Sequence, residues 1–136
     1  MTKKIITILL FLLYLGSIYA QKQFSTQPHT GPVTCLVQNN EFVFSSGEDG
    51  FIVRWDQNGL GEHLQVSDIA IKKIDVSPDG RLIAVYESDD FSIHRISVWD
   101  WKTKTRKYAK RFSDTVLSVS FSYNGTYLMI GLSSAD

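Results

Sequence analysis

The chain has very little cysteine: Cys35 is the one cysteine among its 136 residues. A single cysteine excludes an intramolecular disulfide and a zinc site built from several thiolates. Because Cys35 lies in an alternating apolar stretch, we expect a small buried hydrophobic side chain there. The stability of the fold must then come from packing alone.

The sequence also lacks an excess of charge of either sign, with 14 basic and 14 acidic residues. This balance gives no overall steering toward nucleic acid, and no nucleic-acid partner is expected. The three histidines, His29, His63 and His94, lack the spacing of metal ligands. We expect His63 and His94 in exposed strand or turn positions. No catalytic constellation is visible, so the sequence predicts a protein without cofactor or metal that is not an enzyme.

Long apolar runs are missing after the first 20 residues. Residues 1–20 begin with two lysines close to the start, continue with twelve residues without a charge and end in the small Ala20. This layout predicts a secretory signal peptide, followed by a short linker at 21–28. The mature protein would then be exported to the periplasm or the exterior, with no stable membrane span. The alternative is a membrane anchor formed by residues 5–20, which is shorter than the span of about 20 residues that a bilayer needs.

A sustained helical period is absent, whereas a repeat of 44 to 45 residues is present. Trp55-Asp56 recurs as Trp99-Asp100, 44 residues later. The stretch DVSPDGRLIAV at 75–85 matches SFSYNGTYLMI at 120–130 with an offset of 45. In each stretch an Asp-Gly or Asn-Gly pair separates two apolar runs, which is typical of a tight turn between β-strands. This period suits a four-stranded blade of a β-propeller.

From about residue 29 onward the chain resembles the WD-repeat family of β-propellers. The first repeat has the fullest match, with His29 before the first strand, Ser45 in the second, Asp49 in the tight turn and Trp55 in the third. The resemblance implies that these four side chains form a buried hydrogen-bond network, in which Asp49 orients the histidine. Ser45 is preferred to Ser46 on spacing. Such a network stiffens a blade and marks no active site.

The second repeat departs from this pattern. It has no histidine before its first strand, and Ile93 stands where the turn aspartate should be, six residues before Trp99. About four inserted residues lengthen its second hairpin. The Trp99-Asp100 pair still supports a blade, but the polar network is expected to be absent from it.

The repeats predict an all-β chain that forms a partial β-propeller of four-stranded antiparallel blades. We place the propeller segment at 29–136, with blades at about 29–67 and 68–112 and an incomplete one at 113–136. Because a propeller must close into a ring, the sequence predicts the N-terminal part of a longer propeller. The missing blades, or self-association of several copies, would be needed to close that ring.

The stretch 102–111 holds six basic residues and no acidic one. It is either a patch for phosphate or an anionic membrane, or the solvated outermost strand of the second blade, which we favour. The resemblance implies an exported scaffold that binds other proteins through its loops. The alternatives are a fragment of a propeller enzyme or ligand-binding propeller, and a truncated remnant without independent function.

Overall fold

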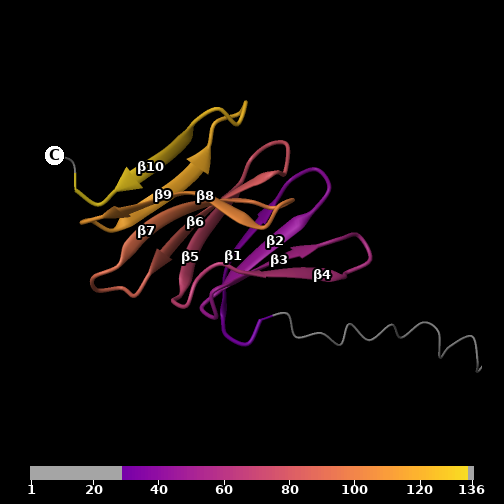
Figure 1. Cartoon of the computed structure of the whole chain (residues 1–136), viewed down its shortest axis with the longest axis horizontal. Coiled ribbons are helices and arrows are strands. Elements are labelled where there is room, and N and C mark those ends of the chain that lie inside the picture. Colours follow the sequence, from indigo (N-terminus) through magenta and orange to yellow (C-terminus); the bar gives the residue numbers. More distant parts are fainter. Residues whose placement is uncertain (1–28, 135–136) are drawn as a thin grey trace, which may run out of the picture.

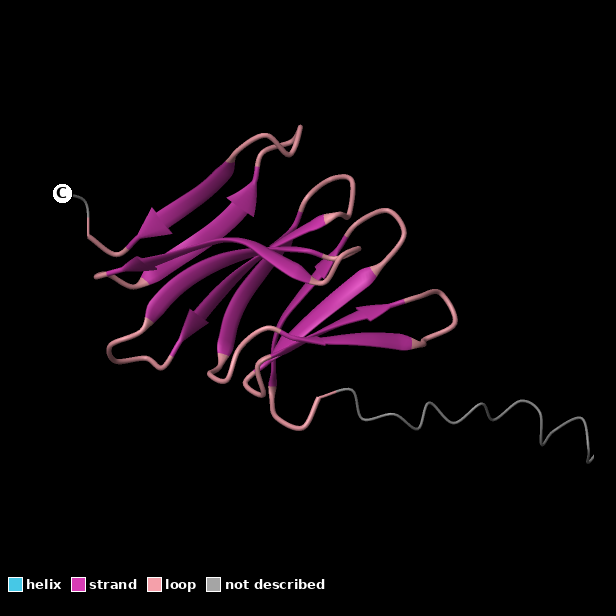
Figure 2. Ribbon diagram, in the orientation of Figure 1, coloured by secondary structure: helices cyan, strands magenta, loops and turns pink. Residues whose placement is uncertain are grey.

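The computed structural model describes residues 29–134, and Figure 1 shows their arrangement. The signal peptide predicted at 1–20 and the linker at 21–28 lie outside the described residues. Within the described range every regular element is a strand, as Figure 2 shows, and none is a helix that could cross a membrane. The strands are β1 (Val33–Gln38), β2 (Val43–Gly47), β3 (Phe51–Trp55), β4 (Gly61–Gln65), β5 (Ile71–Val76), β6 (Leu82–Ser88), β7 (His94–Asp100), β8 (Thr105–Phe112), β9 (Val116–Phe121) and β10 (Leu128–Leu132).

The strands form three antiparallel sheets in which each strand pairs with the next one along the chain. β1 to β4 make the first four-stranded sheet, β5 to β8 the second, and β9 and β10 a two-stranded sheet. The three sheets stand side by side in Figure 1 and do not close into a ring. The all-β, incomplete propeller predicted from the repeat is therefore confirmed.

The turn between β5 and β6 and the turn between β9 and β10 have the same geometry. Gly80 and Gly125 have φ angles of 71° and 70°, which a residue with a side chain rarely adopts. In one turn the Leu82 N–H donates to Ser77 Oγ at 2.9 Å, and in the other the Tyr127 N–H donates to Ser122 Oγ at 3.0 Å. The 45-residue repeat of the sequence is therefore also a repeat of backbone conformation.

Apolar side chains fill the space between adjacent sheets. The first and second sheets share one core, and the second and third share another around Tyr86, Ile96 and Val116. Full burial of one such aliphatic or aromatic side chain contributes about 1.5–3 kcal/mol. Cys35 is half-buried and packs against the first core. The buried members of that first core are Phe44, Ile52, Val66, Ile71, Ile74, Ile83, Val85 and Trp101.

Candidate functional site

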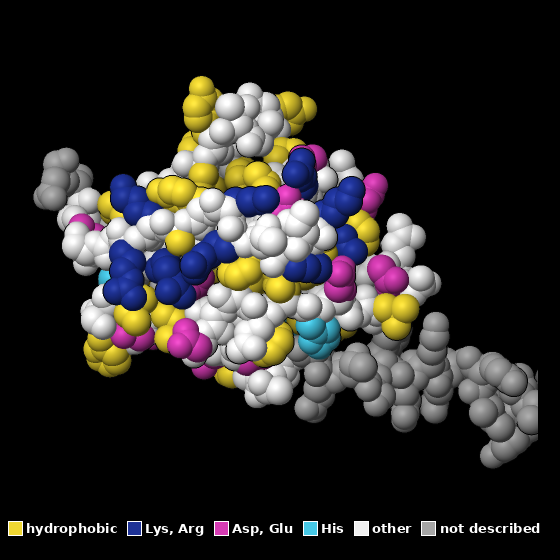
Figure 3. All heavy atoms as spheres, in the orientation of Figure 1, with side chains coloured by type: hydrophobic (Ala, Val, Ile, Leu, Met, Phe, Trp, Pro, Cys, Tyr) yellow, Lys and Arg dark blue, Asp and Glu magenta, His cyan; other side chains and the backbone are white. Residues whose placement is uncertain are grey.

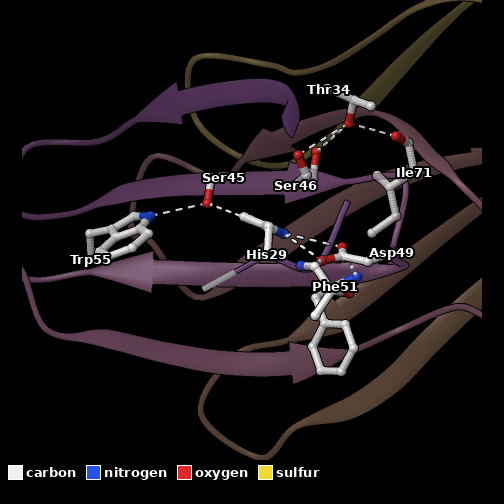
Figure 4. A network of polar contacts seen from close by, with 9 residues as sticks. His29, Thr34, Ser45, Ser46, Asp49, Phe51, Trp55 and Ile71 are labelled. Carbon is white, nitrogen blue, oxygen red and sulfur yellow. Dashed lines mark hydrogen bonds and ion pairs between the residues drawn. The ribbon is translucent and has the colours of Figure 1, made fainter. Parts of the chain in front are cut away.

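The four residues predicted to form a network in the first repeat lie together in the structure (Figure 4). His29 Nδ1 is 3.1 Å from both carboxylate oxygens of Asp49, and His29 Nε2 is 2.8 Å from Ser45 Oγ. The indole N–H of Trp55 donates to Ser45 Oγ at 3.0 Å. A carboxylate can only accept, so His29 donates from Nδ1, and in the neutral ring Nε2 is then the acceptor of the Ser45 hydroxyl. Each polar atom in this chain of contacts then has a partner.

The backbone of the first sheet brings these side chains to one place. Val43 pairs with Trp55 and Ser45 pairs with Val53, so Ser45 and Trp55 lie on the same face of neighbouring strands. Asp49, in the turn between β2 and β3, also accepts the N–H groups of Thr30 at 2.8 Å and Phe51 at 3.1 Å. The carboxylate therefore closes its own turn while it ties the segment before β1 to the sheet.

Glycine at position 47 makes room for the histidine. A Cβ atom there would lie 2.8 Å from His29 Nδ1 and 2.7 Å from an Asp49 oxygen, closer than such contacts normally come. The next residue back, Ser46, points to the other side of the sheet, where its hydroxyl lies 3.3 Å from Thr34 Oγ1. Thr34 donates to the Ile71 carbonyl at 2.6 Å and so links the first sheet to the second.

The pKa of Asp49 lies below its ordinary value. Burial by itself would raise this pKa, because it disfavours the charged form. The N–H donated by Phe51, the ring N–H of His29 and the N–H of Thr30 outweigh burial and lower the pKa. The first sheet therefore holds Asp49 as a carboxylate.

Among the described residues, the second repeat lacks the network of His, Ser, Asp and Trp, as predicted, but the structure has a different polar network there that was not predicted. Glu87, on β6, is fully buried and accepts hydrogen bonds from the Ser67 hydroxyl at 3.1 Å and the Ser97 hydroxyl at 2.8 Å. Arg95 forms an ion pair with the same carboxylate, with its Nε at 2.7 Å. Ser97 Oγ in turn accepts the indole N–H of Trp99 at 3.0 Å. The second sheet thus has a network of different composition, built on a carboxylate in place of an imidazole.

The aspartates of the two Trp-Asp pairs shape the turns that follow them. Asp56 Oδ1 accepts the N–H groups of Asn58 at 2.8 Å and Leu60 at 2.9 Å. Asp100 is fully buried and accepts the N–H groups of Lys102 and Thr103 at Oδ1. The Thr103 N–H is the main cause that lowers the pKa of Asp100 below its ordinary value.

The other two histidines differ from each other. His63 is exposed on β4, as expected, but the exposed position predicted for His94 is wrong. His94 is 7% exposed, and its Nδ1 lies 2.8 Å from Tyr86 Oη and 3.1 Å from Ser88 Oγ. Across residues 29–134, no three His, Cys, Asp or Glu side chains are grouped so that they could hold a metal ion.

A cleft of about 440 Å³ opens between the first two sheets, and the sequence reasoning did not anticipate it. Glu62 on β4 accepts the Trp101 indole N–H at 3.0 Å and forms ion pairs with Arg54 at 2.8 Å and Lys104 at 2.9 Å. The Lys104 ammonium lies 3.3 Å from the centre of the Trp101 ring. The second tryptophan of WDWK, Trp101, was the one available signal. The cleft is lined by Arg54, Glu62, Gly80, Arg81, Trp101 and Lys102.

Known proteins resemble this chain over most of its length. A family model described as an N-terminal β-propeller domain matches residues 19–136. An uncharacterised protein of Treponema pallidum (strain Nichols) is 36% identical over 107 residues, which is 78% of this chain and 18% of that protein. The chain therefore spans less than a fifth of the length of this relative.

A solved structure shares the fold. The β-propeller domain of Cps50 (Swd1) from Myceliophteria thermophila superposes with a TM-score of 0.65 and 21% sequence identity. The match covers 79% of this chain and 33% of that domain's chain. This likeness shows the fold, and the family model shows that the chain belongs to the TP_0598_N family of N-terminal β-propeller domains.

Proposed function

We propose that this chain is part of an exported β-propeller that acts as a protein-interaction scaffold. The observation that carries the proposal is the hydrogen bonding of His29 in the first sheet. Both ring nitrogens of His29 are engaged, one by Ser45 and one by Asp49, and the side chain is 3% exposed. An imidazole held in this way has no nitrogen left to accept a proton from a substrate. The network then serves to hold the first sheet together, and the surface of the propeller binds the partner proteins.

Exposed aromatic side chains at two turns support this proposal. Phe91, between β6 and β7, is 89% exposed, and Tyr123, between β9 and β10, is 99% exposed. The two turns lie at opposite ends of the sheets in Figure 1. Aromatic residues are enriched at protein interfaces, because they bury a large area at low cost in side-chain entropy. Exposed aromatic residues at both ends of the sheets would give a scaffold two regions that can contact other proteins.

A photo-crosslinking residue tests the scaffold role. We expect benzoylphenylalanine at position 91 or 123 of the full-length protein to form a covalent adduct with a defined protein in the producing cells. Benzoylphenylalanine at position 68, in the exposed segment that links β4 to β5, is the control. Adducts of equal yield at all three positions, or at none, would argue against the scaffold. Turnover of a small molecule by the full-length protein would instead favour the propeller-enzyme alternative.

Export is tested separately at the N-terminus. The two lysines and the short uncharged stretch before Ala20 support cleavage by a signal peptidase. Sequencing of the exported protein should therefore find Gln21 or a close neighbour as the first residue. Recovery of chains that begin at Met1 in the membrane fraction would favour the anchor.

A further inference from the structure

Strand β8 is an open edge of the second sheet. The strand order β5-β6-β7-β8 leaves one side of β8 without a hydrogen-bonded neighbour among the described residues. Seven of its eight residues are exposed, and only Phe112 is partly covered. The free side therefore presents backbone N–H and C=O groups that an extended chain could pair with. At about 3.3 Å per residue, the strand offers a track of about 26 Å.

Four cations lie along this track and none of them has an acidic partner in the described part of the chain. They are Arg106, Lys107, Lys110 and Arg111, here called the basic edge. Figure 3 shows dark blue side chains gathered across this face of the molecule. The strand itself contains no acidic residue. The charges of the basic edge are thus left for a ligand.

The two arginines of the basic edge share one face of the sheet. Arg111 pairs with Arg95, and Arg106 pairs with Trp99 across a bulge. Because alternate residues of β7 lie on the same face, Arg106 and Arg111 are on the side of Arg95 and Trp99. A guanidinium can hold a carboxylate through two parallel hydrogen bonds, so this face is suited to carboxylates.

We propose that the basic edge docks an acidic, extended segment of a partner protein, which adds to the second sheet as a strand beside β8. The segment's backbone pairs with the free side of β8, and its carboxylates meet Arg106 and Arg111. This deepens the proposed scaffold function and rests on it. The proposal names the chemistry of one partner surface, about eight residues long.

Charge decides which chain can pair with this edge. Two copies of the protein joined through β8 would bring four cations against four, so the basic edge opposes self-association. An acidic strand brings opposite charges together and gains the same ladder of backbone hydrogen bonds. The cleft beside Trp101 continues the positive surface, since Lys102 on its rim is exposed and has no ion pair among residues 29–134.

Fluorescence anisotropy with the full-length protein tests the proposal. The probe is a labelled ten-residue peptide of alternating Glu and Val, at low salt. A second peptide has the same sequence with N-methyl groups on alternate residues, which keep every charge and remove the N–H donors. We expect the first peptide to bind, and the methylated peptide to bind at least about tenfold more weakly, because the strand ladder is lost. Equal binding of the two peptides would overturn strand addition.

Two variants test the place of binding. Arg106→Gln with Arg111→Gln should weaken binding of the unmodified peptide at least about tenfold, since two charge-assisted contacts are lost. The matched control, Lys72→Gln with Lys73→Gln on β5, removes the same charge three strands away and should bind as the parent does. Equal loss in both variants would show general charge attraction and would overturn the proposal.

Two further probes separate this partner from other polyanions. Vesicles that contain phosphatidylglycerol and a single-stranded oligothymidine should bind more weakly than the peptide, and tighter binding of either would overturn the proposal. The crosslinking experiment tests the scaffold role independently of peptide binding. Crosslinks at positions 91 and 123 together with no peptide binding would refute the docking site and leave the scaffold standing.

Discussion

Glu87 in the second sheet occupies the register position that Gly47 occupies in the first. Gly47 lies four residues beyond Val43, the partner of Trp55, and Glu87 lies four residues beyond Ile83, the partner of Trp99. In the first sheet, the space over Gly47 is filled by the His29 ring, which comes from outside the sheet. In the second sheet, the Glu87 side chain fills it from its own strand. In both sheets the tryptophan indole donates to a serine hydroxyl, and that serine contacts His29 in the first sheet and Glu87 in the second.

We expect Asp49→Ala to lower the free energy of unfolding by about 1–3 kcal/mol, because it leaves the donors of His29, Thr30 and Phe51 without their acceptor, and the His29 side chain is only 3% exposed. Denaturant unfolding of the full-length protein measures the change. Asp68→Ala, at an exposed position, is the control and should stay within about 0.5 kcal/mol of the parent. Equal stability of the two variants would contradict a role for the network in stability.

Gly47→Ala should also destabilise the first sheet, by about 1–3 kcal/mol, because the new methyl group would displace the His29–Asp49 pair. Gly31→Ala is the matched control, since its Cβ would come no closer than 3.4 Å to any atom. The thermal midpoints of the two variants decide the matter. If both midpoints fall equally, the tight fit over position 47 is not the cause.

Glu87→Ala should cost about 3 kcal/mol or more, since it leaves Arg95 and two buried hydroxyls without an acceptor. Because both residues belong to one network, Glu87→Ala combined with Arg95→Ala should cost less than the sum of the single changes. A double-mutant cycle by urea unfolding measures this coupling. Strict additivity would mean that the pair does not act as a unit.

The lowered pKa of Asp49 predicts a loss of stability in acid. The folded state binds the Asp49 proton less readily than the unfolded state, whose pKa is near 3.8. The contribution is therefore complete above that pH and falls as the pH drops from it toward the folded pKa. We expect the stability difference between the parent and Asp49→Asn to shrink below about pH 4. A difference that stays constant from pH 6 to pH 2.5 would contradict this linkage.

Local chemistry is the part of this protein that could be predicted from its sequence. The turns at Gly80 and Gly125 depend on side chains within five residues, and Asp49 closes its own turn in the same way. Such short-range hydrogen bonds act in the same manner wherever the segment lies, so their residue types identify them. The repeat and the hairpins followed from these signals, whereas the residues of the first network were implied by the resemblance to the WD-repeat family.

The contacts of Glu87 and His94 were decided only by the tertiary structure. Glu87 meets Ser67, 20 residues earlier, and Ser97, ten residues later, in a register that no motif records. His94 is buried because it lies on the face of the second sheet that packs toward the third, and an isolated hairpin would leave it in water. Burial of a polar side chain depends on which sheet covers it, so its partners are chosen by packing rather than by spacing.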